Sequence, residues 1–398
     1  MDYKKKINWN NYILSLCPIF LIFYISNETY AIDFRAFYLA GKSVLNNLNP
    51  YLNHVGIDND FYGPINSELF KFSGWKYPPL ASYLFVPLAK LPYELSKNIF
   101  NLISLLSCSI LTFLIIQRRI FVINPTSLMI YGISFPLLAT ISRGQIEILI
   151  VSMALVSLYF FNKGKLFISA FIIAFLGFLK IFPLALTISF FRSNNIKKFI
   201  IYLFLSLLSL LILNFIFCPI EWNKSFIERI LIPWDEMPLG DLKELPSNLG
   251  VIKDSMMVMT SDARNLFHSH FFVFGFANPL LSDTLFISGI IGSIGAFICL
   301  LKYSNYSNVL CFLTIMNWIN IINPISWIMG LIWYVPLFIY SFDKVKSSYK
   351  IMLILPLILP PFLNASGYLA AIISLFILKI YKKESLKSIQ RSQENFLY

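Results

Sequence analysis

Long apolar runs, separated by short turns rich in Lys and Arg, occupy most of this chain. A helix needs about 20 apolar residues to cross a bilayer, so each run predicts a membrane-spanning helix. We therefore predict an all-α integral membrane protein, a bundle of about 12 transmembrane helices. The predicted spans cover residues 11–27, 95–117, 121–141, 145–162, 166–179, 181–191, 198–218, 284–301, 307–323, 325–342, 350–364 and 366–381.

The two short runs on either side of Lys180 leave two interpretations open, a broken helix or a re-entrant hairpin. Two polar segments, 28–94 and 219–283, predict large loops on the outer side of one transmembrane domain. That single domain covers residues 1–383, and a polar cytoplasmic tail, 384–398, follows it.

The first loop contains two predicted helices. Apolar residues from Phe34 to Leu45 follow helical i, i+3, i+4 and i+7 steps, which predicts an amphipathic helix beside the membrane. The stretch Pro78–Pro92 predicts a short helix in or dipping into the outer leaflet. Its Pro78-Pro79 pair is also typical of a plain helix start.

Charge orients this topology. With a cytoplasmic N-terminus, the inner side carries 19 Lys and Arg against 4 Asp and Glu, and the outer side 13 against 16, which together make 32 basic and 20 acidic residues. Inner loops favour Lys and Arg, so both termini are predicted to be cytoplasmic. The net charge of +12 then reflects topology, and we predict no nucleic-acid partner.

Composition agrees with a membrane location, since 57% of residues are hydrophobic and the mean hydropathy is +0.70. Lys4, Lys5 and Lys6 before the run Tyr12–Ser26 resemble a signal peptide. We predict an uncleaved first span instead, because the remaining topology is consistent only when this span is counted. The five cysteines lack metal-ligand spacing and are predicted to be free thiols. With no phosphate-binding Gly-Lys-Ser/Thr loop and no metal-ligand cluster in the sequence, we predict no cofactor and no metal.

Polar residues converge on the outer face in this threading. Asp33 follows the first span, Lys76 precedes the next entry into the membrane, and Arg143 and Lys180 occupy outer turns. Ionisable groups at membrane depth cost about 2.5–3.5 kcal/mol each on insertion scales, so they usually line a cavity. The pattern predicts a polar cavity at the outer membrane boundary.

Several short motifs resemble a known family. The stretch Asp33-Phe-Arg-Ala-Phe-Tyr-Leu-Ala-Gly41, followed by Asn49-Pro50-Tyr51, is similar to the opening of bacterial polyprenol-phosphate-sugar-dependent glycosyltransferases of the GT-C superfamily. The branch includes the mycobacterial phosphatidylinositol-mannoside mannosyltransferases and arabinofuranosyltransferases. Further similar motifs follow in order, from about residue 30 to 340: Tyr77-Pro78-Pro79-Leu80, Gly144-Gln145, Leu179-Lys180 with Pro183, and Asn323-Pro324-Ile325-Ser326-Trp327.

The resemblance implies a GT-C-like bundle in the bacterial plasma membrane, with its active site facing outward. It also implies inverting transfer of a sugar, mannose by default, from a polyprenyl-phosphate donor to a glycan or glycolipid acceptor. Asp33 would be the general base, although a free aspartate is weak at neutral pH, so alignment must help. Candidate donor phosphate and sugar contacts are Lys180, Arg143, Gln145, Lys76, Asn248, His268 and His270.

Two departures from the family concern those contacts. The chain reads Trp327-Ile328-Met329-Gly330 where relatives often carry histidine, and Pro246-Ser247-Asn248 where an Asn-Gln-Ser motif is common. His268 and His270 are the candidates to replace part of that role.

Structural interpretations stand beside these roles. Asp33 suits an N-cap, and Lys180 suits an ion pair or a position at the interface. Gln145 and Glu147 suit hydrogen bonds between helices. Trp327, Trp333 and Tyr334 suit an interfacial aromatic belt.

Two other functions remain open at this point. A transporter or flippase of a lipid-linked sugar agrees with the break at Lys180, although no counterpart appears in the second half. A glycan polymerase or ligase would share the lipid-linked donor but usually places its key residues in a late external loop. The early Asp33 favours the transferase.

Overall fold

The computed structural model describes residues 17–21, 24, 31–52, 75–117, 124–191, 193–228, 308–322, 328–358, 373, 376 and 377. Within these ranges every regular element is a helix. In chain order they are α2 (Ile32–Leu45), η2 (Pro79–Phe85), α3 (Val86–Ala89), α4 (Tyr93–Gln117), α5 (Pro125–Gly132), α6 (Phe135–Arg143), α7 (Glu147–Asn162), α8 (Leu166–Leu179), η3 (Phe182–Phe190), α9 (Ile196–Phe217), α10 (Ile220–Phe226), α14 (Asn308–Ile322), η7 (Ile328–Tyr334), α15 (Val335–Phe342) and α16 (Ser347–Ile358).

The predicted spans at 95–117, 145–162, 166–179, 198–218 and 307–323 coincide with α4, α7, α8, α9 and α14, so these helices are confirmed. In the described part of the chain, α9 alone is long and apolar enough to cross a membrane as one straight helix. The pair α5 and α6, bent by 49°, is either a second, broken span or a re-entrant loop. A count of 12 spans therefore stays a prediction, and spans such as 284–301 lie outside the described residues.

The single span predicted at 121–141 is instead two helices. Pro136 explains the break between α5 and α6. Proline has no N–H to donate, and its ring clashes with the carbonyl four residues earlier, which is that of Gly132, the last residue of α5. The apolar pattern crosses this break without a gap, so hydropathy alone could not reveal it.

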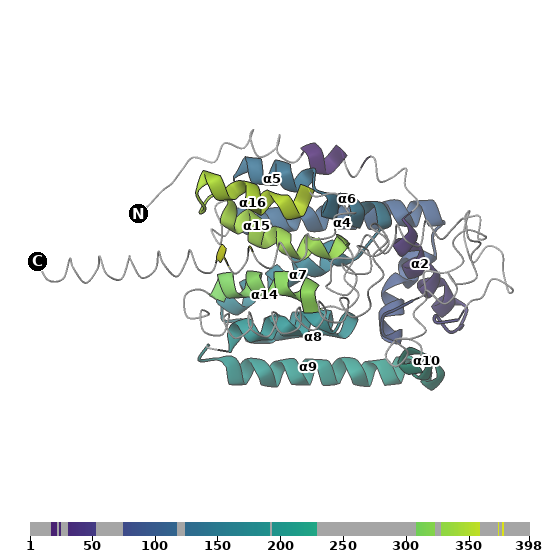
Figure 1. The fold of residues 1–398 in the computed structure, drawn as a ribbon. Coiled ribbons are helices and arrows are strands. Elements are labelled where there is room, and N and C mark those ends of the chain that lie inside the picture. The colour runs from purple at the N-terminus through teal and green to yellow at the C-terminus, as the bar shows by residue number, and fades with distance from the viewer. Residues whose placement is uncertain are drawn as a thin grey trace, which may run out of the picture.

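The helices α8 and α9 run side by side (Figure 1), and η3 packs between α8 and α14. The segment η3 packs closely against α8, because a Cβ atom at Gly177 would lie 2.3 Å from Leu184 Cδ2. The two short runs around Lys180 are thus two packed helical segments, α8 and η3, and no continuous helix joins them.

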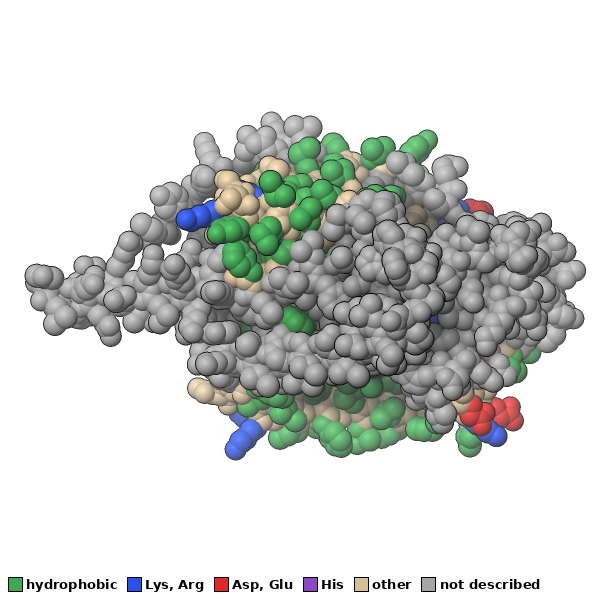
Figure 2. Space-filling view, viewed as in Figure 1, with side chains coloured by type: hydrophobic (Ala, Val, Ile, Leu, Met, Phe, Trp, Pro, Cys, Tyr) green, Lys and Arg blue, Asp and Glu red, His purple; other side chains and the backbone are tan. Residues whose placement is uncertain are grey.

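An apolar surface follows α9. Hydrophobic side chains line the lower edge of Figure 2, where Figure 1 places α9, and charged side chains show at both ends of that edge. Phe204 is 63% exposed and Ile216 is 67% exposed. A surface this apolar on one helix matches contact with lipid hydrocarbon.

The helix predicted from Phe34 to Leu45 is confirmed as α2, but its surroundings differ from the prediction. Arg35 and Ser43, on its expected polar side, are as buried as Phe34 and Phe37. The reason is that α2 packs against four other elements, η2, α3, α4 and α6. Figure 1 places it at one end of the bundle, at the right, near α10.

The stretch Pro78–Pro92 is helical as predicted, divided into η2 and α3. Both begin with proline in the first turn, where the missing N–H costs nothing. The Leu80 N–H donates to Asn214 Oδ1 (2.9 Å), and the Tyr83 hydroxyl donates to the Phe217 carbonyl (2.8 Å). These bonds attach the end of the first loop to the C-terminal end of α9.

Candidate functional site

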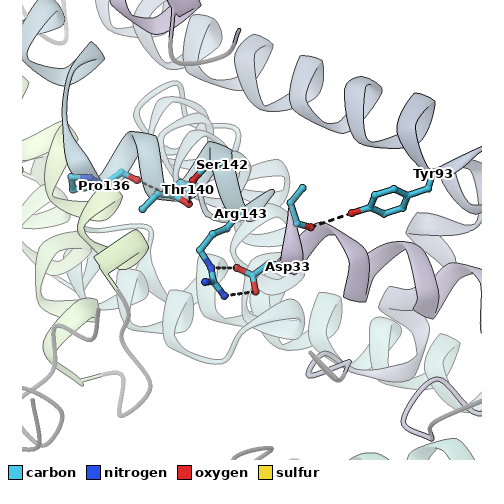
Figure 3. Close-up of polar contacts among 8 residues, drawn as sticks. Asp33, Tyr93, Pro136, Thr140, Ser142 and Arg143 are labelled. Atoms are coloured by element: carbon cyan, nitrogen blue, oxygen red, sulfur yellow. Dashed lines mark hydrogen bonds and ion pairs between the residues drawn. The ribbon is translucent and has the colours of Figure 1, made fainter. Parts of the chain in front are cut away.

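Asp33 lies in the first turn of α2 and is paired with Arg143 at the end of α6. Arg143 Nε donates to Asp33 Oδ2 at 2.6 Å, and its Nη2 donates to Oδ1 at 3.0 Å, as Figure 3 shows. The two side chains are 14% and 16% exposed. A guanidinium and a carboxylate joined by two parallel bonds form a strong, well-oriented pair.

The capping interpretation of Asp33 is wrong. Ala31, in the left-handed region at φ 43°, occupies the N-cap position of α2, and no side chain caps the helix. The Tyr93 hydroxyl donates to the Ala31 carbonyl at 3.4 Å (Figure 3). Asp33 therefore sits inside the first turn, where the helix dipole favours a negative charge.

Gly144 lets Arg143 reach Asp33. It ends α6 at φ 68°, in the left-handed region that favours glycine, and the Gln145 N–H then bonds to the Thr140 carbonyl at 2.9 Å. A Cβ atom at Gly144 would lie 2.5 Å from Phe34 Cβ. The end of α6 can thus touch the start of α2 only if residue 144 has no side chain.

We expect Gly144→Ala to lower both thermal stability and activity. It combines left-handed strain, about 1–2 kcal/mol, with a clash against α2. Gly164→Ala is the matched control, since Gly164 has φ 73° but nothing within 4 Å of its would-be Cβ. Thermal unfolding in detergent should show the larger loss for Gly144→Ala, and equal losses would contradict the close approach.

A second ion pair joins Glu147, in the first turn of α7, to Lys180, just after α8. The Trp333 indole N–H, from η7, donates to the other Glu147 oxygen at 3.0 Å. Lys180 Nζ also lies 5.6 Å from the centre of the Tyr77 ring. The structure therefore confirms an acidic partner for Lys180 and a bridging role for Glu147.

Burial and neighbouring charges shift the pKa values of Tyr77 and Lys180. Burial raises the pKa of Tyr77 to about 12. Burial lowers the pKa of Lys180, but the Glu147 carboxylate and then Tyr77 outweigh it, so the net shift is upward. Lys180 is thus a permanent cation at neutral pH.

The two ion pairs belong to one group of charges. Lys76 has an exposed side chain and interacts electrostatically with Asp33, Arg143 and Lys180. Tyr77 interacts in the same way with Asp33, Glu147 and Lys180. We call Asp33, Lys76, Arg143, Glu147 and Lys180 the charged cluster.

The structure thus brings together four of the predicted site residues: Asp33, Lys76, Arg143 and Lys180. The fifth, Gln145, follows Arg143 directly, and its side-chain oxygen is buried without a hydrogen-bond partner in the described part of the chain. Among the described residues, that oxygen makes no hydrogen bond to another helix. Asn248, His268 and His270 lie outside the described residues, as does Trp327.

Sequence reasoning missed the roles of Trp333 and Tyr77. The aromatic-belt interpretation of Trp333 and Tyr334 is wrong, because both are buried and each donates to a protein acceptor. Glu147, a carboxylate one residue inside an apolar run, was the signal that a donor had to lie nearby.

In the described ranges, no group of three or more His, Cys, Asp or Glu side chains is arranged to hold a metal ion.

Together, the apolar helical bundle and the charged cluster match a helical membrane protein with a polar site. The family model for glycosyltransferase family 87 matches residues 75–281, just over half of the chain. The chain therefore belongs to glycosyltransferase family 87, a family of membrane glycosyltransferases of the GT-C type.

The matched segment contains Lys76, Arg143, Glu147 and Lys180, whereas Asp33 lies before it. The expected glycosyltransferase class and GT-C type are confirmed. No curated protein and no solved structure matches the chain.

Proposed function

We propose that this glycosyltransferase moves a sugar, mannose by default, from a polyprenyl-phosphate donor to an extracytoplasmic glycan or glycolipid acceptor, with inversion. The proposal places it in the bacterial plasma membrane with both termini cytoplasmic. The observation that carries it is the charged cluster, in which an oriented carboxylate, Asp33, lies among three cations.

In the proposed reaction Asp33 is the general base. An acceptor hydroxyl oxygen attacks the anomeric carbon and gives its proton to Asp33 as the new glycosidic bond forms. The bond from that carbon to the phosphate oxygen breaks, and its electron pair leaves with the lipid phosphate. Arg143 occupies one lone-pair direction on each Asp33 oxygen, so further directions can accept the acceptor hydroxyl.

The charge balance of the cluster suits a phosphate. Arg143 and Lys180 each pair with one carboxylate, and Lys76, when protonated, adds one excess positive charge. The donor is a phosphodiester with one negative charge, and the departing lipid phosphate gains a second. Fixed cations near the leaving oxygen would stabilise this developing charge.

Gln145 supplies a candidate sugar contact in the proposed site. Its buried oxygen has no hydrogen-bond partner among the described residues, and it adjoins Arg143 in sequence. A buried acceptor without a donor costs about 1–3 kcal/mol, and a sugar hydroxyl would remove that cost. Asn248, His268 and His270 remain proposed donor contacts from the second outer loop.

The test is transfer by the purified protein in detergent or liposomes. A panel of radiolabelled polyprenyl-phosphate sugars is compared with the corresponding nucleotide sugars. We expect transfer from at least one lipid-linked donor and none from nucleotide sugars, and inverted stereochemistry of the product by NMR. Transfer from nucleotide sugars alone would refute the donor class. Translocation of the lipid-linked sugar without transfer would instead support a flippase, and chain extension would support a polymerase.

A further inference from the structure

Glu147 is a buried carboxylate with no part in the reaction proposed above. It is 9% exposed, yet both of its oxygens are engaged: Lys180 donates to Oε1 and Trp333 to Oε2. These partners come from different parts of the chain, the turn after α8 and the segment η7. Glu147 therefore links three segments at one point.

The position of the Lys180 ammonium depends on these contacts. Lys180 follows α8 with an extended backbone (φ −140°, ψ 124°), so the helix does not direct its side chain. A lysine side chain has four rotatable bonds and no planar fork to orient it. The Glu147 carboxylate and the Tyr77 ring both lie beside the ammonium and hold it within the charged cluster.

We propose that Glu147 is a positioning residue, which holds the Lys180 ammonium where it meets the phosphate of the lipid-linked donor, and that the Trp333 N–H fixes Glu147 for this purpose. The inference rests on the proposed function, because it assigns Lys180 to that phosphate. An ammonium has three N–H donors, so Lys180 can bond to Glu147 and a phosphate oxygen together.

The charge on Glu147 makes the proposal easy to distinguish from a purely electrostatic role. A carboxylate near a phosphate repels it, so its neutralisation alone would tighten donor binding. A positioning role predicts the opposite effect on turnover, because a misplaced cation no longer meets the charge that develops on the leaving oxygen.

The experiment measures kcat and donor KM for four variants beside the wild type. Glu147→Gln keeps an oxygen for the Trp333 N–H but removes the charge that holds Lys180. Trp333→Phe keeps the ring and removes the N–H. Glu147→Asp keeps the charge on a shorter side chain. Tyr334→Phe, which removes a buried hydroxyl donated to the Leu353 carbonyl (2.9 Å) beside Trp333, is the matched control.

We expect Glu147→Gln to lower kcat by about 100-fold, the effect of a group displaced by about 1 Å. Trp333→Phe should lower kcat less, and Glu147→Asp should recover part of the loss. Tyr334→Phe should reduce the unfolding temperature and leave kcat and KM unchanged. Unfolding curves of all variants distinguish a loss of folded protein from a loss of Lys180 positioning. If Glu147→Gln does not fold, the kcat of Trp333→Phe tests the proposal.

Wild-type kcat in folded Glu147→Gln, or a lower donor KM with unchanged kcat, would overturn the positioning role. The proposed function fails separately, if the wild type does not use any polyprenyl-phosphate sugar. In that case the variants are measured with the donor that the wild type does use. Loss of kcat in Glu147→Gln with that donor would keep the positioning of Lys180 and discard the lipid phosphate.

Discussion

Replacement of Asp33 by Asn lowers sugar transfer by about 10²–10⁴-fold, the usual contribution of a general base. Asn keeps the size of Asp and an oxygen for Arg143, but it cannot take a proton from the acceptor hydroxyl. The assay is transfer of radiolabelled sugar from the donor that the wild type uses. Donor binding should persist, since the substitution removes a negative charge near the phosphate and leaves Arg143 and Lys180 in place.

Asp343→Asn is the matched control for this substitution. Asp343 follows α15 and accepts a hydrogen bond from Asn124 Nδ2 at 2.7 Å, in an exposed contact outside the charged cluster. It should transfer sugar at the wild-type rate. Equal transfer by wild type and folded Asp33→Asn would remove Asp33 from the mechanism and leave the glycosyltransferase class unaffected. A loss of transfer that only follows a loss of folded protein would assign Asp33 a structural role.

The helices of this fold were largely predictable because apolar runs and charged turns are local signals. The run Leu166–Leu179, for example, is bounded by Lys165 and Lys180, and α8 has those limits. Breaks within an apolar run were harder to place. At Pro136 the break depends on a clash with a carbonyl four residues earlier, a local effect that hydropathy does not include.

The environment of α2 was not predictable from its own sequence. Its spacing of Phe34, Phe37 and Tyr38 predicts one apolar face, but burial on the other side depends on helices far along the chain. The spacing of apolar residues indicates which face of a helix is apolar. The burial of the whole helix depends on which other elements pack around it.

The candidate site was predictable as a set of residues and not as a set of contacts. Each of Asp33, Arg143 and Lys180 stood out as a charge at the end of an apolar run. Which anion pairs with which cation depends on how α2, α6, α7 and α8 meet, since the Asp33–Arg143 bonds span 110 residues. Trp333 shows the same limit, because its N–H reaches Glu147 across 186 residues.

Replacement of Lys180 by Met should abolish transfer and also destabilise the protein. It leaves the buried Glu147 carboxylate without its counter-charge. Removal of one partner of a buried ion pair typically costs about 3–5 kcal/mol, because the remaining charge is neither paired nor hydrated. The unfolding temperature of Lys180→Met in detergent should therefore fall well below that of the wild type. Lost activity in this variant alone cannot distinguish a missing phosphate partner from a damaged fold.

The double variant Lys180→Met/Glu147→Gln separates these two causes. It contains no unpaired charge at this position, and the amide oxygen of the introduced glutamine still accepts from the Trp333 N–H. Replacement of a buried pair by neutral groups of similar volume is often neutral in stability, so the unfolding temperature should return toward the wild-type value. Transfer should stay lost, because the cation proposed to meet the donor phosphate is gone. If transfer returned together with stability, the Lys180–Glu147 pair would be structural, and the phosphate would have to be bound by Arg143 and Lys76.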